Sequence, residues 1–263
     1  QYHQRYDTEA AALRSGATET VELYYTAQAD GDVIVLEVTG GIGAATAEYV
    51  ISGIEHAESS DARLVIIEMD TPGGLVSSTR DIVQEILSST VPVATYVTPD
   101  GARADSAGTY ILQACHVAAM APATTLGSAT PVRLGGLPKM PRRDDDTGDD
   151  GSTATPTDTD TGQEPAVKPD VDTPEPADAM ERKLINDAAA YLRGLAVLRG
   201  RNAEWAEQAV RAADNLTAEE ALQRNVIDLT ASDVADLIQR LNGRSVKVLG
   251  ESVQLDTDGL AAE

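Results

Sequence analysis

Short apolar runs and amphipathic stretches alternate along the first half of the chain. Residues 32–39, 63–69 and 91–98 are rich in β-branched side chains and have the length of buried strands. Over residues 45–58 and 76–87, which follow the first two runs, apolar side chains recur at helical spacing. Strands and helices in alternation predict an α/β fold around a largely parallel sheet.

The pattern continues beyond residue 100 with further elements. We predict a helix at 106–115, a strand at 117–121, helices at 181–199, at 205–212 and from Thr217, a strand at 226–229 and a helix at 232–241. The first 20 residues and the last dozen lack periodicity, so we expect them to be frayed.

One segment in the middle of the chain has a different composition. Between Asp144 and Asp178 there are 12 acidic residues, one basic residue and five prolines. Such a segment cannot bury enough apolar surface to offset its ordering entropy, and we expect it to be a disordered insertion. The expected organisation is a flexible segment (1–30), a core (31–141), the acidic insertion (142–179), the second part of the same domain (180–245) and a tail (246–263).

The charge and composition exclude several classes of protein. The net charge of −23 and the pI of about 4.3 argue against nucleic-acid binding. The single cysteine, Cys115, excludes an internal disulfide and a multi-cysteine metal site. No apolar stretch approaches the roughly 20 residues of a membrane span, so we expect this chain itself to be soluble. The acidic excess, four lysines and absent phenylalanine favour a halophilic source, the alternative being an ordinary acidic surface.

Two predicted strand-to-helix turns carry candidate chemistry. The first, Asp70-Thr71-Pro72-Gly73-Gly74, has a backbone whose amides can point at a ligand or an oxyanion. The second places Ser106 at a helix start, where a hydroxyl is either an N-cap or a nucleophile beside the positive helix end. Turns one unit apart in a parallel sheet lie side by side at the carboxyl ends of the strands, where ligands bind.

A serine nucleophile needs a base, and the chain offers few. His3 lies in the expected frayed start, His56 on the helix after the first strand, and His116 about ten residues or ~15 Å along a helix from Ser106. A Ser-His pair is therefore disfavoured. Lys183, at the start of the long helix, is either a base or a solvated surface residue.

Several motifs in order resemble one known family. The chain resembles the membrane-bound serine proteases of the NfeD group, the stomatin operon partner proteins of the ClpP/crotonase superfold. The resemblance implies an α/β fold with repeated ββα units, a parallel sheet and C-terminal helices, over about residues 32–245 without the insertion. The motifs are 69–75, 92–97, 101–104, 106–111, 120–122 and Gly127, then 183–186, 200–202, 219–222 and 226–228.

The resemblance also implies an activity and a site. It implies a serine endopeptidase with a Ser-Lys dyad and no cofactor or metal, which cleaves a hydrophobic segment of a stomatin-like membrane partner. It further implies a homodimer or larger oligomer on the extracytoplasmic face of a membrane. The implied residues are the nucleophile Ser106, the base Lys183, the oxyanion donors Gly74 and Ala107, and the substrate contacts Gly73, Leu75 and Gly127.

Two departures from the family pattern leave alternatives open. The acidic insertion separates Ser106 and Lys183 by 77 positions, and Asp105 precedes the nucleophile. Nearby carboxylates favour a charged lysine and oppose its action as a base, so we expect activity to rise in molar salt. The rival interpretations are a crotonase-type enzyme acting on an acyl thioester and a catalytically silent scaffold for a stomatin-like protein.

Overall fold

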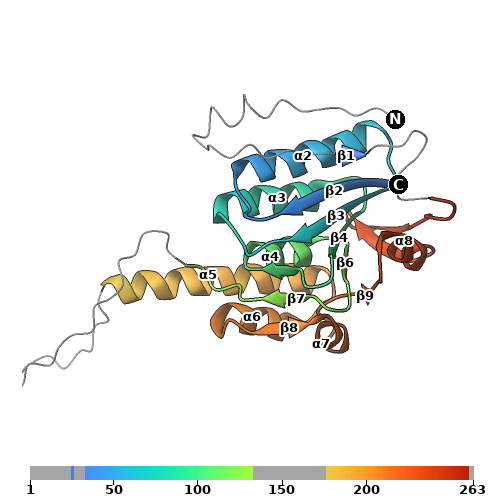
Figure 1. Cartoon of the computed structure of the whole chain (residues 1–263). Helices are drawn as coiled ribbons and strands as arrows, with labels where there is room; N and C mark the ends of the chain where they lie inside the picture. Colours follow the sequence, from blue (N-terminus) through green and yellow to red (C-terminus); the bar gives the residue numbers. More distant parts are fainter. Residues whose placement is uncertain (1–24, 27–32, 133–175, 261–263) are drawn as a thin grey trace, which may run out of the picture.

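The computed structural model describes residues 25–26, 33–132 and 176–260 (Figure 1). Apart from Tyr25–Thr26, which form a strand, the expected flexible segment 1–30 lies outside these residues, as does most of the expected insertion 142–179.

A mostly parallel sheet crosses the centre of the molecule (Figure 1). Five of its strands are parallel, and β1 is antiparallel to β2 at one edge. The order across the sheet is β1 (Tyr25–Thr26), β2 (Val33–Thr39), β3 (Leu64–Asp70), β4 (Val93–Val97), β6 (Val117–Met120) and β9 (Leu229–Thr230). The prediction of an α/β fold with a parallel sheet is confirmed.

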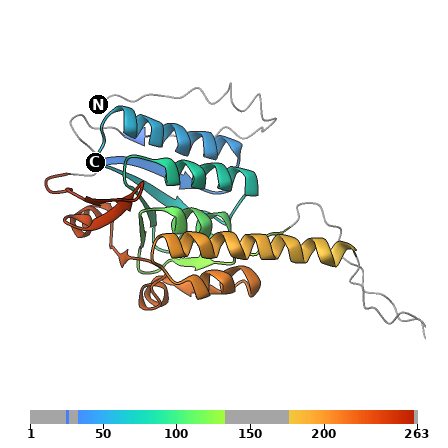
Figure 2. The same ribbon diagram turned by 180° about the vertical axis from the view of Figure 1, so that it is seen from behind.

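Helices cover both faces of this sheet. Figure 2 shows the first four described helices side by side in one layer, and apolar residues on them share a core with alternate residues of the strands. The helices are α2 (Ala44–Ser59), α3 (Val76–Ser88), α4 (Ala107–Ala114), α5 (Pro176–Leu198), α6 (Ala203–Arg211), α7 (Ala218–Gln223) and α8 (Val234–Leu241).

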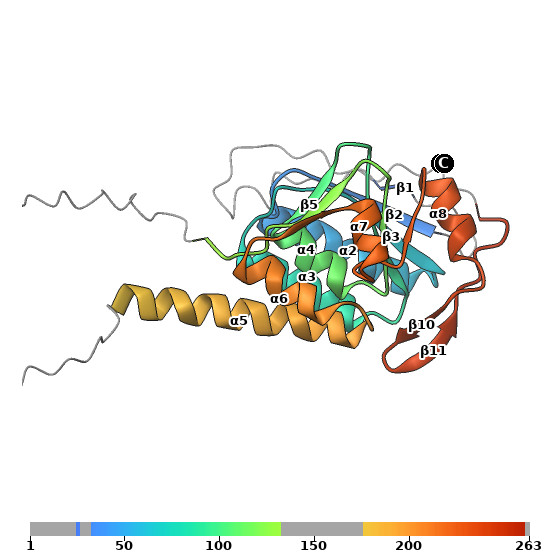
Figure 3. The same ribbon diagram turned by 90° about the horizontal axis from the view of Figure 1, so that it is seen from below.

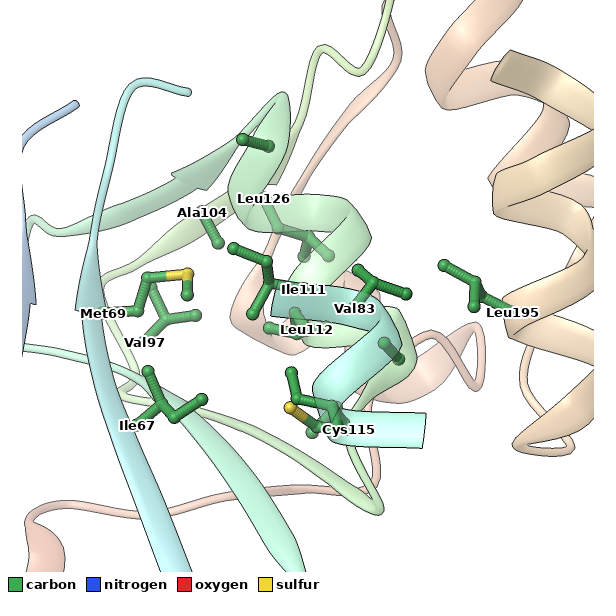
Figure 4. Close-up of a cluster of buried hydrophobic side chains, with 14 of the residues drawn as sticks. Ile67, Met69, Val83, Val97, Ala104, Ile111, Leu112, Cys115, Leu126 and Leu195 are labelled. Atoms are coloured by element: carbon green, nitrogen blue, oxygen red, sulfur yellow. The ribbon is translucent and has the colours of Figure 1, made fainter. Parts of the chain in front are cut away.

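The two cores follow from the two-residue period of the strands. Ile34 and Leu36 belong to the core under α2–α6, whereas Val33 belongs to the core formed with α8 on the opposite face. Figure 4 shows the larger core where β3 and β4 meet α4, with Ile67 and Ile111 among its buried side chains. β3 and β4 are buried almost throughout, as is typical of parallel strands covered by helices, whereas Glu37 and Thr39 of β2 are exposed.

A small second sheet lies beside the carboxyl end of the main sheet. Its strands are β5 (Arg103–Asp105), β7 (Thr125–Gly127) and β8 (Asn215–Thr217), with β5 and β7 parallel and β7 and β8 antiparallel. β5 leads directly into α4, so this sheet fixes the start of that helix.

Three expectations need correction. α5 begins at Pro176, before residue 181 and inside the expected insertion. Of the strand expected at 226–229, only Leu229 belongs to a strand, β9. Val226 and Ile227 are buried in the core but lie outside any strand. We expected a tail at 246–263 and a frayed last dozen residues. Part of this segment instead forms a hairpin of β10 (Ser245–Val248) and β11 (Glu251–Gln254), seen near α8 in Figure 3. Val246, Val248 and Leu255 are buried against the core that includes α8, which explains why this segment folds.

Candidate active site

Ser106 stands at the junction of β5 and α4 in an unusual backbone conformation. Its φ is +50° and its ψ is −110°, in a region that residues with a side chain rarely adopt. Its amide donates to the carbonyl of Gly127 at 2.9 Å. Its hydroxyl makes no capping hydrogen bond to α4 and has no hydrogen-bond partner among the described residues. The N-cap alternative is therefore contradicted for this side chain, and the hydroxyl is available to a ligand.

The turn that follows β3 is in contact with Ser106. Gly73 has a φ of +118°, and a Cβ placed on it would lie 2.7 Å from Ser106 Cβ and 3.6 Å from the amide nitrogen of Ala107. A side chain at position 73 would therefore collide with Ser106. The prediction that the two strand-to-helix turns lie side by side is confirmed.

Two backbone amides near Ser106 are unpaired within the described part of the chain. Ala107 is the first residue of α4, at the end of the helix where backbone amides are unsatisfied and the dipole is positive. Neither its amide nor that of Gly74 donates to an acceptor among the described residues. Unpaired amides of this kind can stabilise an oxyanion.

The predicted substrate contacts have different positions. Leu75 precedes α3 and is 42 % exposed, so its side chain is accessible. Gly73 donates its amide to Thr71 Oγ1 and accepts from the amide of Ile42, while Gly127 accepts from Ser106 and donates to Thr109 Oγ1. The amide and carbonyl of both glycines are thus hydrogen-bonded within the fold, so these glycines support the shape of the site.

An apolar pocket opens beside Ser106. It lies between α3, α4 and α5 and has an empty volume of about 560 Å³, part of which is open to solvent. Its lining consists of Gly74, Val76, Thr79, Arg80, Ser106, Ala107, Tyr110, Ala129, Pro131, Leu184, Asp187, Ala188 and Tyr191. Ser106 and one face of α5 therefore line the same pocket.

Lys183 is carried by the same helix but does not line this pocket. Its side chain is exposed and makes no ion pair or hydrogen bond with another described residue. The next residue, Leu184, does line the pocket, as does Asp187 one turn further along. Figures 1 and 3 show that the N-terminal turns of α5 extend beyond α4 and α6. α5 therefore lies beside Ser106, but Lys183 lies next to the residues of α5 that line the pocket and not among them.

Sequence reasoning missed a polar cluster that holds α5 to the pocket wall. Arg80 Nη2 on α3 lies 2.8 Å from Asp187 Oδ2, and the guanidinium carbon lies 4.5 Å from the centroid of the Tyr191 ring. The rings of Tyr191 and Tyr110 stack with centroids 5.9 Å apart. Burial raises the pKa of the Tyr110 hydroxyl, which therefore stays protonated. The helical spacing of Leu184, Asp187 and Tyr191 was the available signal that these three side chains share one face of α5.

Asp105 places a carboxyl group immediately before the nucleophile. Burial raises the pKa of this carboxyl, the neighbouring charge of Asp70 adds to the rise, and Arg103 opposes it. Arg103 Nη1 lies 3.5 Å from Asp105 Oδ2. The carboxyl that precedes Ser106 is therefore partly buried and paired with Arg103, which partly offsets its charge near the site.

The described residues contain no group of three or more histidine, cysteine, aspartate or glutamate side chains placed to hold a metal ion. None of the helices described has the length and apolar character that a bilayer span requires.

Comparison with known proteins places this chain in a family. The profile of the NfeD1b N-terminal domain family matches residues 32–138. The membrane-bound protease PH1510 of Pyrococcus horikoshii is 35 % identical over 216 residues, which are 82 % of this chain and 41 % of that protein. The membrane protein NfeD1b of Bacillus subtilis is 38 % identical over 98 residues, 37 % of this chain and 22 % of that protein. The chain thus spans less than half the length of these relatives.

Solved structures agree with the sequence relatives. A serine-to-alanine variant of the 1510-N membrane-bound stomatin-specific protease superposes with a TM-score of 0.68 at 31 % identity, covering 89 % of this chain and 96 % of that one. A lysine-to-alanine variant of 1510-N in complex with a substrate peptide gives 0.69 at 33 % identity, covering 89 % and 91 %. The fold is the α/β fold of these ClpP-like structures, with five parallel strands and C-terminal helices. The chain belongs to the family of the 1510-N membrane-bound stomatin-specific protease of Pyrococcus horikoshii.

Proposed function

We propose that this chain is a serine endopeptidase domain in which Ser106 is the nucleophile and Lys183 the general base. One observation carries the proposal. Ser106, whose hydroxyl has no partner among the described residues, lines the same apolar pocket as Gly74 and Ala107, whose amides are unpaired there, and α5 lines this pocket too. A serine oxygen beside two amide donors is the arrangement that acyl transfer requires.

The reaction proceeds by covalent catalysis in two stages. Ser106 Oγ attacks the scissile carbonyl carbon while its proton passes to an uncharged Lys183, and the carbonyl oxygen becomes an oxyanion facing the Gly74 and Ala107 amides. Collapse of this intermediate breaks the peptide C–N bond, and the lysine returns the proton to the leaving amine. Water then hydrolyses the acyl-enzyme by the same steps.

The spacing of serine and lysine supports the choice of Lys183. The serine and lysine replaced in the two 1510-N variants are about forty positions apart in that protein. Ser106 and Lys183 are 77 positions apart here, of which 35 belong to the acidic segment Asp144–Asp178. Without that segment the separation matches. A long connection does not prevent contact, because doubling a flexible loop costs only about 0.6 kcal/mol.

The substrate in this proposal is a hydrophobic segment of a membrane-associated partner such as a stomatin-like protein. The pocket wall is mostly apolar, and the exposed side chains of Leu75 and Val76 extend apolar surface along its rim. A peptide with a run of apolar residues would bury this surface. We further propose that the domain works as a homodimer or larger oligomer on the extracytoplasmic face of a membrane, as the family resemblance implies.

A catalytically silent scaffold that binds the same partner is the second candidate. The position of Lys183, exposed and outside the pocket lining, favours it. In that case the apolar pocket would bind a segment without cleaving it.

Peptide cleavage distinguishes the two functions. A peptide with a long apolar run is incubated with the wild type, Ser106→Ala, Lys183→Ala and the control Lys247→Ala, which removes an exposed lysine from β10. The endopeptidase predicts cleavage by the wild type and the control, with a loss of at least about 10³-fold in the other two. Binding without cleavage at any salt concentration supports the scaffold, and cleavage that survives both active-site changes refutes the dyad.

A further inference from the structure

We propose that Thr71 is a positioning residue that holds the two halves of the oxyanion site in register. The inference rests on the proposed function, because it concerns the amides of Gly74 and Ala107. These two amides come from different segments, the turn after β3 and the start of α4. Some group must fix one segment relative to the other, and Thr71 contacts both.

The Thr71 hydroxyl organises the glycine turn. Thr71 is fully buried, and its Oγ1 donates to the carbonyl of Gly40 at 2.6 Å. The same oxygen accepts the amide of Gly73 at 3.1 Å. The Thr71 hydroxyl therefore fixes the position of Gly73, which directly precedes Gly74 and its unpaired amide.

The Thr71 main chain is bonded to the segment that carries the nucleophile. Its amide donates to the carbonyl of Arg103 at 2.8 Å, and its carbonyl accepts the amide of Asp105 at 3.0 Å. Asp105 directly precedes Ser106. One residue thus bonds to Gly73 through its side chain and to β5 through its backbone.

The Thr71 methyl group adds a third contact, with α4. A Cβ placed on Gly108 would lie 2.6 Å from Thr71 Cγ2, so the methyl packs directly against the second residue of that helix. This packing keeps α4 close to the same residue, while the hydroxyl bonds to Gly40 and Gly73 are the contacts to which we assign the positioning of the glycine turn.

Register matters here because an oxyanion must meet both donors at once. Productive donors lie about 2.7–3.1 Å from the oxyanion, and a misplacement of 1 Å can cost about 100-fold in rate. Losing the hydroxyl releases the turn from Thr71 while leaving the Ser106 segment in place. The expected consequence is a loss in kcat, since the oxyanion forms only after the peptide has bound.

Three variants test the inference in the peptide-cleavage assay. Thr71→Val keeps the shape and the methyl but removes the hydroxyl with its hydrogen bonds to Gly40 and Gly73, whereas Thr71→Ser keeps the hydroxyl and removes the methyl. Thr95→Val is the matched control, because Thr95 is equally buried but lies within β4 with its hydroxyl 2.8 Å from Cys115 Sγ. We expect Thr71→Val to lower kcat about 10- to 100-fold with KM within threefold. Thr71→Ser should stay within about fivefold of the wild type, and Thr95→Val should keep the wild-type kcat.

The possible outcomes separate this inference from the proposed function. A folded Thr71→Val with the kcat of Thr95→Val overturns the inference alone. If Thr71→Val does not fold, Thr71→Ser decides, because a tenfold or greater loss of kcat in a folded chain that retains the hydroxyl also overturns it. A wild type that binds the peptide without Ser106-dependent cleavage overturns the proposed function, and this inference with it.

Discussion

Arg80 and Asp187 form an ion pair across the wall of the pocket that Ser106 lines. Arg80 Nη2 lies 2.8 Å from Asp187 Oδ2 and joins α3 to α5, the helix that carries Lys183. The guanidinium also stacks on Tyr191, so the pair is part of a larger contact between the two helices. The position of α5 beside Ser106 therefore depends on polar contacts as well as on apolar packing.

We expect Arg80→Gln to weaken peptide binding more than it weakens the fold. Both side chains of the pair are about half exposed or more, and such pairs contribute about 0–1 kcal/mol to stability. Loss of the pair frees the pocket-facing turns of α5, so KM for the apolar peptide should rise about 3- to 10-fold. Arg193→Gln is the control, because Arg193 pairs with Glu207 at 2.9 Å and is similarly exposed, but neither residue lines the pocket. An equal rise in KM for both variants would contradict the prediction.

Ser106→Gly should be more stable than Ser106→Ala, although both are inactive. The φ of +50° at this position costs free energy for any residue with a side chain but little for glycine. We expect a difference in unfolding free energy of about 1 kcal/mol, measured by urea denaturation. Ser52 within α2 is the control, since glycine there should be less stable than alanine by a similar amount. If the two positions show the same sign, the backbone at Ser106 is not strained.

Arg201→Met should destabilise the whole domain. The Arg201 side chain is 1 % exposed, and its Nη2 lies 2.6 Å from Asp228 Oδ2. The guanidinium also donates to the carbonyls of Leu112 and Cys115 at the C-terminal end of α4. Breaking a buried pair while leaving its partner costs about 3–5 kcal/mol. Chemical denaturation measures this loss. Adding Asp228→Asn should recover part of it, because an uncharged amide then replaces the unpaired carboxylate.

The helices and the relation between the two turns were predictable because each depends on local pattern or on a general property of parallel sheets. Helical spacing at 45–58 and 76–87 predicted α2 and α3 to within a residue or two. The contact of Gly73 with Ser106 followed from their places after neighbouring strands. These inferences needed no knowledge of which side chains meet.

The rest depends on tertiary contacts that leave little trace in the sequence. Strands of three residues, such as β5 and β7, are too short to show a two-residue period. Arg80 and Asp187 each have the appearance of a charge on a solvated helix face, and only packing brings them together across 107 positions. The role of Thr71 is likewise invisible before Gly40 and Gly73 are seen around its hydroxyl.

His116 should make the fold sensitive to acid. It is 7 % exposed between α4 and β6, and its Nδ1 accepts the amide of Val93 at 3.1 Å. Burial lowers the pKa of His116 to about 3, and the charges of Arg199 and Arg201 add to this effect. The folded chain therefore holds the imidazole neutral, while the unfolded chain protonates it below its ordinary pKa of 6.5.

The sign of the pH dependence follows from this difference. Below pH 6.5 the unfolded state binds a proton that the folded state does not, so the stabilisation present at neutral pH is lost as the pH falls toward 3. The contribution of one group approaches about 1.4 kcal/mol per pH unit. In His116→Asn the amide oxygen can still accept from Val93 without titrating, so its unfolding free energy should fall less steeply than that of the wild type. Carboxyls with a raised pKa, such as Glu68, act in the opposite direction but are common to both chains and cancel in the comparison. Parallel curves for the two proteins between pH 7 and 4 would show that His116 is protonated without cost in the folded state.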